Sequence, residues 1–439
     1  MKLPIKREIR TLENGLKVIL IQKKGFSKSF FMMGVPAGSL NQIDLVNGQT
    51  IDHRSGCAHF LEHQMFRLNG EDVTYPLARA QARCNAMTTY SMTTYFVSTQ
   101  ADPFEPLRLL IEFVQTLEIT SETVEKEKGI ILSEYYQYEQ DPDSRLQLET
   151  FRSLYQTLPL KEDVLGTVED IQEMSVQDLE AFYQTWYDPS QLVLIGITGH
   201  ELEPLFSFIE EMEKNYPSRK EHKAKRYLAF EPQEVARKHF ETKMDVQLGY
   251  AGLGVKLPPM GDNCPGKEIV KKDYMLNLWI NAFFGPLSQD WQTWLDTRLM
   301  ASGNIAEGDL DTDHGYIMIY GLTDRPQEYL ETMKDILKKK PLLTKEKFES
   351  LLIQEKAGSI RTFDNFDSLA FVSLEGAFGD FDFFEDLSLL NSITLEEVND
   401  YISSLDFSNL CETIITPLHP HDEEGFEEGQ ESFLEAFES

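Results

Sequence analysis

The sequence predicts an α+β protein built from two units of similar size. Its 439 residues exceed the roughly 150 residues typical of one domain, and 41% apolar residues suffice for sizeable cores. Strand-like and helix-like segments follow one another in the first half, and the same order begins again after a charged stretch. We therefore expect an N-terminal domain at 1–216, a linker at 217–232, a C-terminal domain at 233–420 and an acidic tail at 421–439.

In the N-terminal half, the pair Asn14-Gly15 between two apolar-rich runs predicts a two-residue hairpin turn. The run FFMMGVPAG predicts a buried strand, residues 76–83 a short helix, and NAMTTYSMTTYFVSTQ a strand. PFEPLRLLIEFVQTL predicts a helix that starts at a proline. SETVEKEKGIILSEYYQYEQ predicts a helix of about twenty residues with Ser121 as its N-cap.

The segment PSRKEHKAKRY, from Pro217 on, is basic within an acidic chain and has no apolar periodicity, which is typical of a linker. After it, MDVQLGYAGLGV, GYIMIYGLT and CETIITP predict strands. YMLNLWINAFFG, EYLETMKDILKKK and KEKFESLLIQEKAG predict helices, and ESFLEAF predicts a short helix in the acidic tail. The two halves share this alternation of predicted strands and helices, without a strong sequence repeat.

The charge of -32 excludes some partners. A generally acidic surface repels phosphate backbones and anionic lipid, so we expect no nucleic acid and no membrane as partners. The first residues lack a signal-peptide pattern, and no run of about 18 apolar residues occurs. Four widely spaced cysteines without a CxxC pattern favour a reducing compartment, so we expect a cytoplasmic protein.

The stretch GCAHFLEHQMF carries two histidines that can share one helical face. His59 and His63 are four residues apart, and imidazole is a common zinc ligand. Glu62 borders the same face, where a carboxylate can act on a zinc-activated water as a general base. The order His-x-x-Glu-His is the inverse of the commoner zincin order.

Catalytic zinc typically takes three protein ligands, so a third must come from another element. The helix from Ser121 offers Glu127 and Glu134, seven residues apart and therefore on one face. Either can supply the oxygen, while the other orients a ligand. Alternatively the histidines form a solvated turn, or join Cys57 and Cys84 in a closed structural site. Surrounding apolar residues favour a buried turn, where unpartnered polar groups would be costly.

Together these residues resemble the inverzincin zinc peptidases of the pitrilysin–insulinase–mitochondrial processing peptidase family, closest to small cytoplasmic bacterial members. The resemblance rests on LENGLKVIL, VPAGS, GCAHFLEHQMF, CNAMTTYSMTTYF, VEKEKGIILSE and LGTVEDIQEMSVQDLEAFYQTWYDPSQLVLIGITG. It implies two paralogous-type domains, each a mixed, largely antiparallel sheet with helices packed on it. It further implies Zn²⁺ on His59, His63 and Glu134, Glu62 as general base and Glu127 as an orienting acid.

The resemblance also implies that Asn85 and Ala86 lie on a substrate-contacting edge strand, although Asn85 also suits a turn at a strand start. Active members need an Arg and a Tyr from a second half. In LDTRLMASGNIAEGDL, Arg298 is off by one position, so it is either a substrate-binding or an ordinary surface residue, and Ala306 stands at the Tyr position.

This departure implies a dimer, either with itself or with a related chain that lacks the zinc motif, and we favour the second. The expected function is a zinc endopeptidase acting on short unfolded peptides. The alternatives are a non-catalytic or partner-dependent peptide-binding subunit and a purely structural zinc protein.

Overall fold

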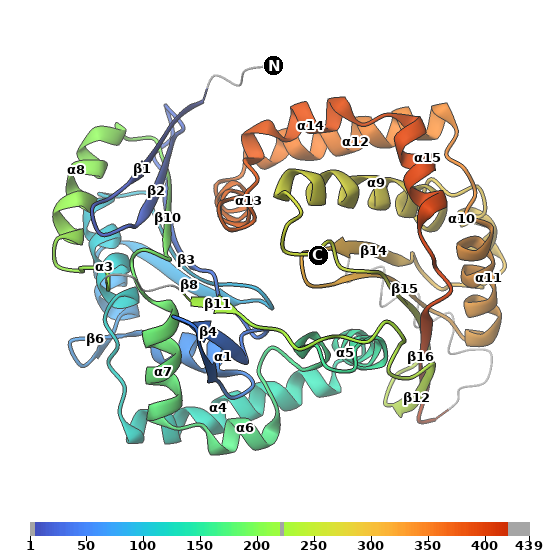
Figure 1. Ribbon diagram of the computed structural model, residues 1–439, viewed down its shortest axis with the longest axis horizontal. Helices are drawn as coiled ribbons and strands as arrows, with labels where there is room; N and C mark the ends of the chain where they lie inside the picture. The colour runs from blue at the N-terminus through green and yellow to red at the C-terminus, as the bar shows by residue number, and fades with distance from the viewer. Residues whose placement is uncertain (1–4, 220–223, 420–439) are drawn as a thin grey trace. The chain divides into compact units, whose positions relative to one another are not determined.

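The computed structural model describes residues 5–219 and 224–419 (Figure 1). The predicted acidic tail at 421–439, with its helix, lies outside the described residues. The chain divides into two compact units. Unit 1 consists of Met1–Tyr135, Glu162–Leu228 and Arg361–Phe383, and unit 2 of Tyr136–Lys161, Ala229–Ile360 and Phe384–Ser439.

Each compact unit consists of three separate segments of the chain, whereas the predicted domains at 1–216 and 233–420 are contiguous. Residues 136–161 come from the N-terminal half but belong to unit 2, and residues 361–383 come from the C-terminal half but belong to unit 1. Each exchanged segment contains a helix that packs on the sheet of its unit, and no local pattern reveals which sheet a helix will cover.

Unit 1 is built on a six-stranded sheet in the order β1-β2-β10-β3-β9-β8, so β8 lies at an edge. Only the β2–β10 pair is parallel among these five pairings. The strands are β1 (Lys6–Thr11), β2 (Lys17–Gln22), β3 (Ser29–Val35), β8 (Ala82–Thr88), β9 (Thr93–Thr99) and β10 (Val193–Thr198). Outside this sheet, β4 (Ile43–Val46) pairs with β5 (Gln49–Asp52), and β6 (Arg67–Leu68) pairs with β7 (Glu71–Asp72).

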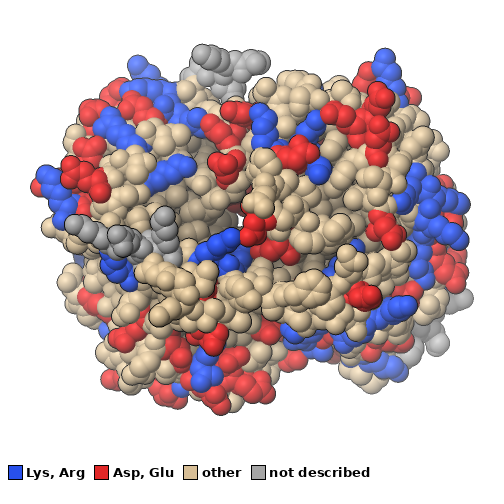
Figure 2. All heavy atoms as spheres, in the orientation of Figure 1, with Lys and Arg blue, Asp and Glu red and all other residues tan. Residues whose placement is uncertain are grey.

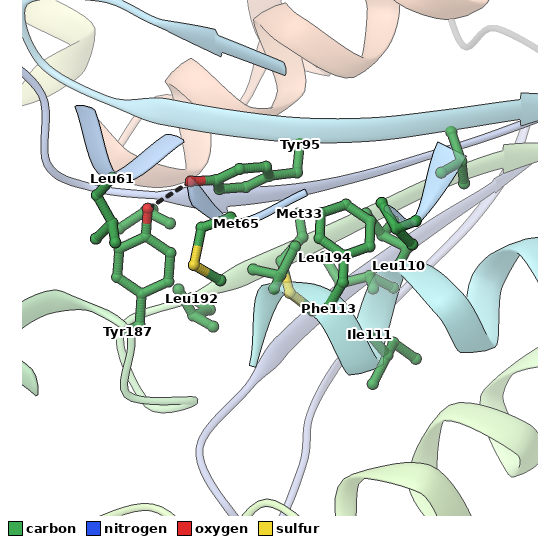
Figure 3. Close-up of a cluster of buried hydrophobic side chains, with 14 of the residues drawn as sticks. Met33, Leu61, Met65, Tyr95, Leu110, Ile111, Phe113, Tyr187, Leu192 and Leu194 are labelled. Carbon is green, nitrogen blue, oxygen red and sulfur yellow. Dashed lines mark hydrogen bonds between the residues drawn. The ribbon is translucent and has the colours of Figure 1, made fainter. Parts of the chain in front are cut away.

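Helices cover both faces of this sheet, and the alternation of side chains along β3 assigns the faces. Met33 belongs to the main core with residues of α3 (Phe104–Val114), as Figure 3 shows. Gly34 faces α13 (Phe366–Phe378), where an added Cβ would lie 2.4 Å from the side chain of Leu374. The unit's other helices are α1 (Cys57–Gln64), α2 (Thr74–Arg79), most of α4 (Ser121–Gln140), α6 (Val168–Glu173), α7 (Val176–Trp186) and α8 (Leu202–Glu213).

Two predicted elements of the N-terminal half differ from the structure. The first hairpin has a five-residue loop, because pairing resumes at Thr11 and Lys17. The amide of Asn14 does not close a two-residue turn but donates to Glu213 Oε2 at 2.7 Å.

NAMTTYSMTTYFVSTQ contains two strands, β8 and β9. The hydroxyl of Thr89 accepts from the backbone of Ser91 and Met92 and so makes the turn without glycine or proline. The predicted helix at 76–83 ends at Arg79, and β8 begins at Ala82.

Part of the predicted linker at 217–232 is a strand. Residues Ala224–Arg226 form β11, which pairs antiparallel with β4. The basic composition of this stretch conceals the strand, because backbone pairing at a sheet edge requires no apolar periodicity.

Unit 2 is built on a five-stranded sheet in the order β12-β16-β13-β15-β14. The strands are β12 (His239–Met244), β13 (Tyr250–Lys256), β14 (Ile305–Leu310), β15 (Gly315–Leu322) and β16 (Leu410–Pro417). The predicted strand MDVQLGYAGLGV corresponds to β13, which begins only at Tyr250, and its first residue, Met244, is the last residue of β12. The pair β12–β16 is parallel, and the other three pairs are antiparallel.

In unit 2 the glycines Gly252 and Gly254 of β13 face α5 (Pro142–Leu154), since added Cβ atoms would lie nearest to Leu146 and Thr150. The opposite face of β13 joins a core with α9 (Gly266–Phe284) and α11 (Pro326–Lys339). The remaining helices of the C-terminal half are α10 (Trp291–Asp296), α12 (Lys345–Thr362), α14 (Asp386–Ser392) and α15 (Leu395–Ser404).

The two sheets share one topology. The sequence β2-β10-β3-β9-β8 in unit 1 matches β12-β16-β13-β15-β14 in unit 2, with the parallel pair in the same place. The predicted fold of two paralogous-type α+β domains with mixed, largely antiparallel sheets is therefore confirmed. Both units follow one plan although no strong sequence repeat connects them.

The surface carries both signs of charge, and Lys and Arg lie among Asp and Glu on the face drawn in Figure 2. The whole sequence has 73 Asp and Glu against 41 Lys and Arg. All four cysteines are free thiols. Among the described residues, no helix combines the length and the apolar character needed to cross a bilayer.

Candidate metal centre

The histidine pair lies on α1, a short helix that is mostly buried in the core of unit 1. The relative exposure of His59 is 7% and that of Glu62 is 8%. Gly56 precedes the helix with φ of 76°, and an added Cβ there would lie 2.0 Å from the main-chain oxygen of Leu165. A close backbone contact with another loop therefore sets where α1 begins. The alternative of a solvated turn is wrong, because α1 is packed on the core.

The acids come from α4 (Ser121–Gln140), which agrees with the predicted helix. Its cap is one residue earlier than predicted, because the hydroxyl of Thr120, not Ser121, accepts from the backbone of Thr123 at 3.2 Å. Glu127 and Glu134 lie on the same side of the helix, two turns apart, and both reach the histidines of α1.

Three of these side chains converge on one point. Oε2 of Glu134 lies 3.8 Å from Nε2 of His59 and 3.7 Å from Nε2 of His63. One ligand atom from each of the three lies within 4.8 Å of the others. The structure therefore brings together the three residues predicted as zinc ligands.

The donor set fits zinc. Ligand atoms placed about 2.0–2.2 Å from a tetrahedral ion lie about 3.4 Å from one another, a few tenths of an ångström less than the separations found here. Two imidazoles and one carboxylate leave the fourth position open, as catalytic zinc sites require. Two imidazole nitrogens that face a carboxylate therefore suit a divalent cation.

The tautomer of His63 is set by Glu127. Oε1 of Glu127 lies 2.9 Å from Nδ1 of His63, so Nδ1 carries a proton, and Nε2, which faces Glu134, is the nitrogen that can ligate a metal. Burial lowers the pKa of His63, but the hydrogen bond to Glu127 and the charges of three carboxylates outweigh it and raise the pKa. The negative surroundings therefore favour positive charge at this imidazole.

His59 is held in the neutral form. Burial, with a smaller effect from His63, lowers the pKa of His59 to about 3. Its Nδ1 is buried without a hydrogen-bond partner. A neutral imidazole keeps a free lone pair and is the form that ligates metals.

Glu62 lies beside the ligands but has a different partner. The hydroxyl of Thr88 donates to Oε2 of Glu62 at 2.6 Å. Burial raises the pKa of Glu62, and the hydrogen bond from Thr88 opposes that change. Sequence reasoning missed Thr88, although alternation along β8 places it with Ala86 and Cys84 on the side that packs toward the core.

Two buried tyrosines lie behind α1. The hydroxyls of Tyr95 and Tyr187 are hydrogen-bonded to each other at 2.7 Å, beside Leu61 and Met65 (Figure 3). The side of α1 opposite the acids is therefore packed against aromatic and apolar groups, which fixes the orientation of the helix.

The predicted substrate residues lie in different units. Asn85 is exposed and Ala86 half-buried on β8, at the edge of the sheet of unit 1. Edge strands present unpaired backbone groups. Arg298 belongs to unit 2 and lies two residues after the end of α10, with a positive φ of 56°.

A second group of acids with a histidine occurs in unit 2, at the turn between β14 and β15. Asp311, Asp313 and His314 offer ligand atoms within 4.8 Å of one another. However, both ring nitrogens of His314 already contact carboxylates, Nδ1 with Asp313 and Nε2 with Asp309. Both ring nitrogens of His314 are therefore hydrogen-bonded, whereas Nε2 of His59 and Nε2 of His63 lie 3.8 and 3.7 Å from Glu134, beyond hydrogen-bond distance.

The alternative of a closed site with cysteines is wrong for the described residues. Neither Cys57 nor Cys84 belongs to a group with metal-binding geometry there. The thiol of Cys57 instead points to the main-chain oxygen of Asp178 at 3.7 Å.

Models of two protein families match most of the chain. Residues 17–168 match the family described as Insulinase (Peptidase family M16), and residues 173–354 match the one described as Peptidase M16 inactive domain. The chain is 28% identical over 219 residues to the mitochondrial-processing peptidase subunit beta of Lentinula edodes, which covers 48% of this chain and 44% of that protein.

Two similarities span nearly the whole chain. The uncharacterized zinc protease YmfH of Bacillus subtilis is 30% identical over 410 residues, which cover 92% of this chain and 95% of that protein. A crystal structure of a putative M16-like peptidase from Alicyclobacillus acidocaldarius has a TM-score of 0.90 at 27% identity and covers 95% and 99% of the two chains. The predicted resemblance is confirmed, and the chain belongs to the insulinase family of peptidases, M16.

Proposed function

We propose that the chain is a zinc-dependent endopeptidase in which His59, His63 and Glu134 hold the metal. The observation that carries this proposal is the convergence of both Nε2 atoms on Oε2 of Glu134, at 3.8 and 3.7 Å. Relatives named zinc proteases support the choice of metal.

The roles of the remaining residues follow from their contacts. When bound, zinc acidifies water and polarises the scissile carbonyl. Glu62 takes the proton of the attacking water and returns it to the leaving amine, for which its buried position beside the ligands is suitable. Glu127 holds the proton on Nδ1 of His63 and so keeps Nε2 available.

We propose that the substrate is a peptide that adds to β8 as a further strand. Asn85 and Ala86 lie on this edge, and hydrogen bonds to main-chain groups impose little sequence specificity. Arg298 would contact substrate or intermediate in an assembled chamber.

The assembly we propose is a dimer, in which the second chain supplies the Arg and Tyr that LDTRLMASGNIAEGDL lacks in the expected spacing. A homodimer and a heterodimer with a related chain without the zinc motif both meet this need, and the relative named subunit beta supports the second. We propose a cytoplasmic location, which four free thiols support.

The test is zinc content measured beside peptide cleavage. We expect one zinc per wild-type chain and cleavage of a quenched-fluorescent peptide, and loss of both in Glu134→Gln. Glu125→Gln is the matched control, since Glu125 lies on the same helix but pairs with Lys128 at the surface.

Other outcomes separate the alternatives. Zinc without cleavage would support a peptide-binding subunit that depends on a partner chain. A wild-type chain that binds no zinc would contradict the proposed metal site and favour a scaffolding role.

A further inference from the structure

The hydrogen bond between Thr88 and Glu62 connects the edge strand to the proposed base. Thr88 is the last residue of β8, and Glu62 lies in the last turn of α1. Oγ1 of Thr88 donates to Oε2 of Glu62 at 2.6 Å. Among the described residues, no other hydrogen bond to this carboxylate occurs. One hydroxyl therefore provides the whole hydrogen-bonded support of a carboxylate that is 8% exposed.

The side chain of Thr88 has less conformational freedom than that of Glu62. Thr88 pairs with Thr93 of β9, and Thr93 is fully buried with its hydroxyl bound to the main-chain oxygen of Ala37. Threonine is β-branched and has few χ1 rotamers. Glutamate has three side-chain torsions, so without a partner its carboxylate has several accessible positions.

We infer that Thr88 is a positioning residue, whose hydroxyl holds Oε2 of Glu62 and leaves Oε1 to accept the proton of the attacking water. The inference rests on the proposed peptidase function. It adds that the strand to which a peptide would bind also carries the group that orients the base. A substrate that orders the end of β8 would thereby order Glu62.

The test compares Thr88→Val, which removes the hydroxyl at nearly constant shape, with Thr88→Ser, which retains it. The matched control is Thr94→Val on β9, whose hydroxyl donates to the main-chain oxygen of Met87 and not to the site. Each full-length variant is loaded with zinc, and kcat, KM and zinc content are measured separately. A crystal structure of each metal-free variant locates the Glu62 carboxylate.

We expect kcat of Thr88→Val to fall roughly tenfold to a hundredfold, since a misplaced base loses much of the effect of general-base catalysis. KM and zinc content should stay near the wild-type values, Thr88→Ser should restore most of kcat, and Thr94→Val should behave as wild type. In crystals of Thr88→Val, the carboxylate should leave its wild-type position.

A Glu62 carboxylate that stays in place in Thr88→Val, or an unchanged kcat, would overturn the inference. If the wild type cleaves no peptide, the proposed function fails separately, and the position of the carboxylate in Thr88→Val alone decides the role of Thr88.

Discussion

The carboxylate of Glu127 lies 2.9 Å from Nδ1 of His63, on the side of the imidazole opposite Glu134. Two acids of one helix thus contact the two nitrogens of one histidine. Because Glu127 and Glu134 face different nitrogens, their roles differ. Glu127 fixes the proton and the ring, and Glu134 shares the face on which a metal would bind.

Replacing Glu127 by glutamine should weaken zinc binding by about 10- to 100-fold, the range for a partner that orients a ligand. The neutral amide retains a hydrogen bond but loses the charge that favours the correct tautomer. Competition with a chelator measures the zinc affinity. Glu134→Gln should have a larger effect, and an equal or larger loss in Glu127→Gln would reverse the two roles.

Glu62→Gln should retain one zinc per chain and lose cleavage by about 10²- to 10⁴-fold, because the change deletes the base without deleting a ligand. Zinc analysis and the quenched-fluorescent peptide assay, run on one preparation, separate the two effects. Loss of zinc in this variant would make Glu62 a ligand and contradict the assignment.

Gly56 and Gly70 provide a matched pair for testing how α1 is placed, since both have φ of 76°. An alanine at Gly70 meets no atom within 4 Å and should cost only about 1–2 kcal/mol for the left-handed backbone. An alanine at Gly56 would also collide with Leu165. Gly56→Ala should therefore destabilise the protein more and reduce zinc binding.

Chemical denaturation of both glycine variants, with zinc content as a second measurement, checks this difference. Equal losses of stability in Gly56→Ala and Gly70→Ala would show that the contact with Leu165 does not constrain the start of α1.

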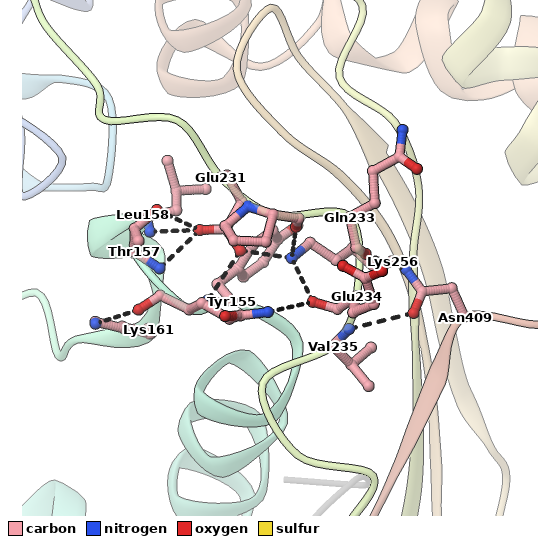
Figure 4. A network of polar contacts seen from close by, with 12 residues as sticks. Tyr155, Thr157, Leu158, Lys161, Glu231, Gln233, Glu234, Val235, Lys256 and Asn409 are labelled. Carbon is pink, nitrogen blue, oxygen red and sulfur yellow. Dashed lines mark hydrogen bonds and ion pairs between the residues drawn. The ribbon is translucent and has the colours of Figure 1, made fainter.

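A polar network in unit 2 predicts a pH dependence of stability (Figure 4). The carboxylate of Glu231 accepts from the backbone of Gln156, Thr157 and Leu158 and pairs with Lys256. Burial raises the pKa of Glu231, but these donors outweigh it and lower the pKa to about 2. In the unfolded chain the pKa of this carboxyl is about 4.3, the usual value for glutamate.

The stability contributed by Glu231 should thus be complete above pH of about 4.3 and be lost as the pH falls toward about 2. In Glu231→Gln, unfolding should become less pH-dependent in that window, and the free energy of unfolding at pH 7 should drop by about 1–3 kcal/mol. Denaturation curves between pH 2 and 7 measure both. Glu234→Gln is the control, because Glu234 joins the network through its main-chain oxygen.

The helices of the site were predictable because their signals are local. His59 and His63 are spaced for one helical face, and Glu127 and Glu134 for another. The boundaries of α4 agree with the prediction, apart from a cap that Thr120 provides. Periodicity and spacing are properties of the sequence, so they can be recognised before the fold is known.

Contacts between distant segments were not predictable in the same way. No local pattern around Asn14 predicts its hydrogen bond to Glu213. The strand Ala224–Arg226 has the composition of a linker. The turn at Thr89 lacks the glycine or proline that marks most turns.

By itself, the sequence determined the residue types of the candidate metal site, their spacing on two helices and the α+β class, because helical geometry converts spacing into a shared face. Only the tertiary structure decided that α5 and α13 cover the sheets of opposite halves, and that Thr88 reaches Glu62. Such pairings depend on how separate elements pack together. Burial of apolar surface is non-directional, so the local sequence of an element does not specify which other element covers it.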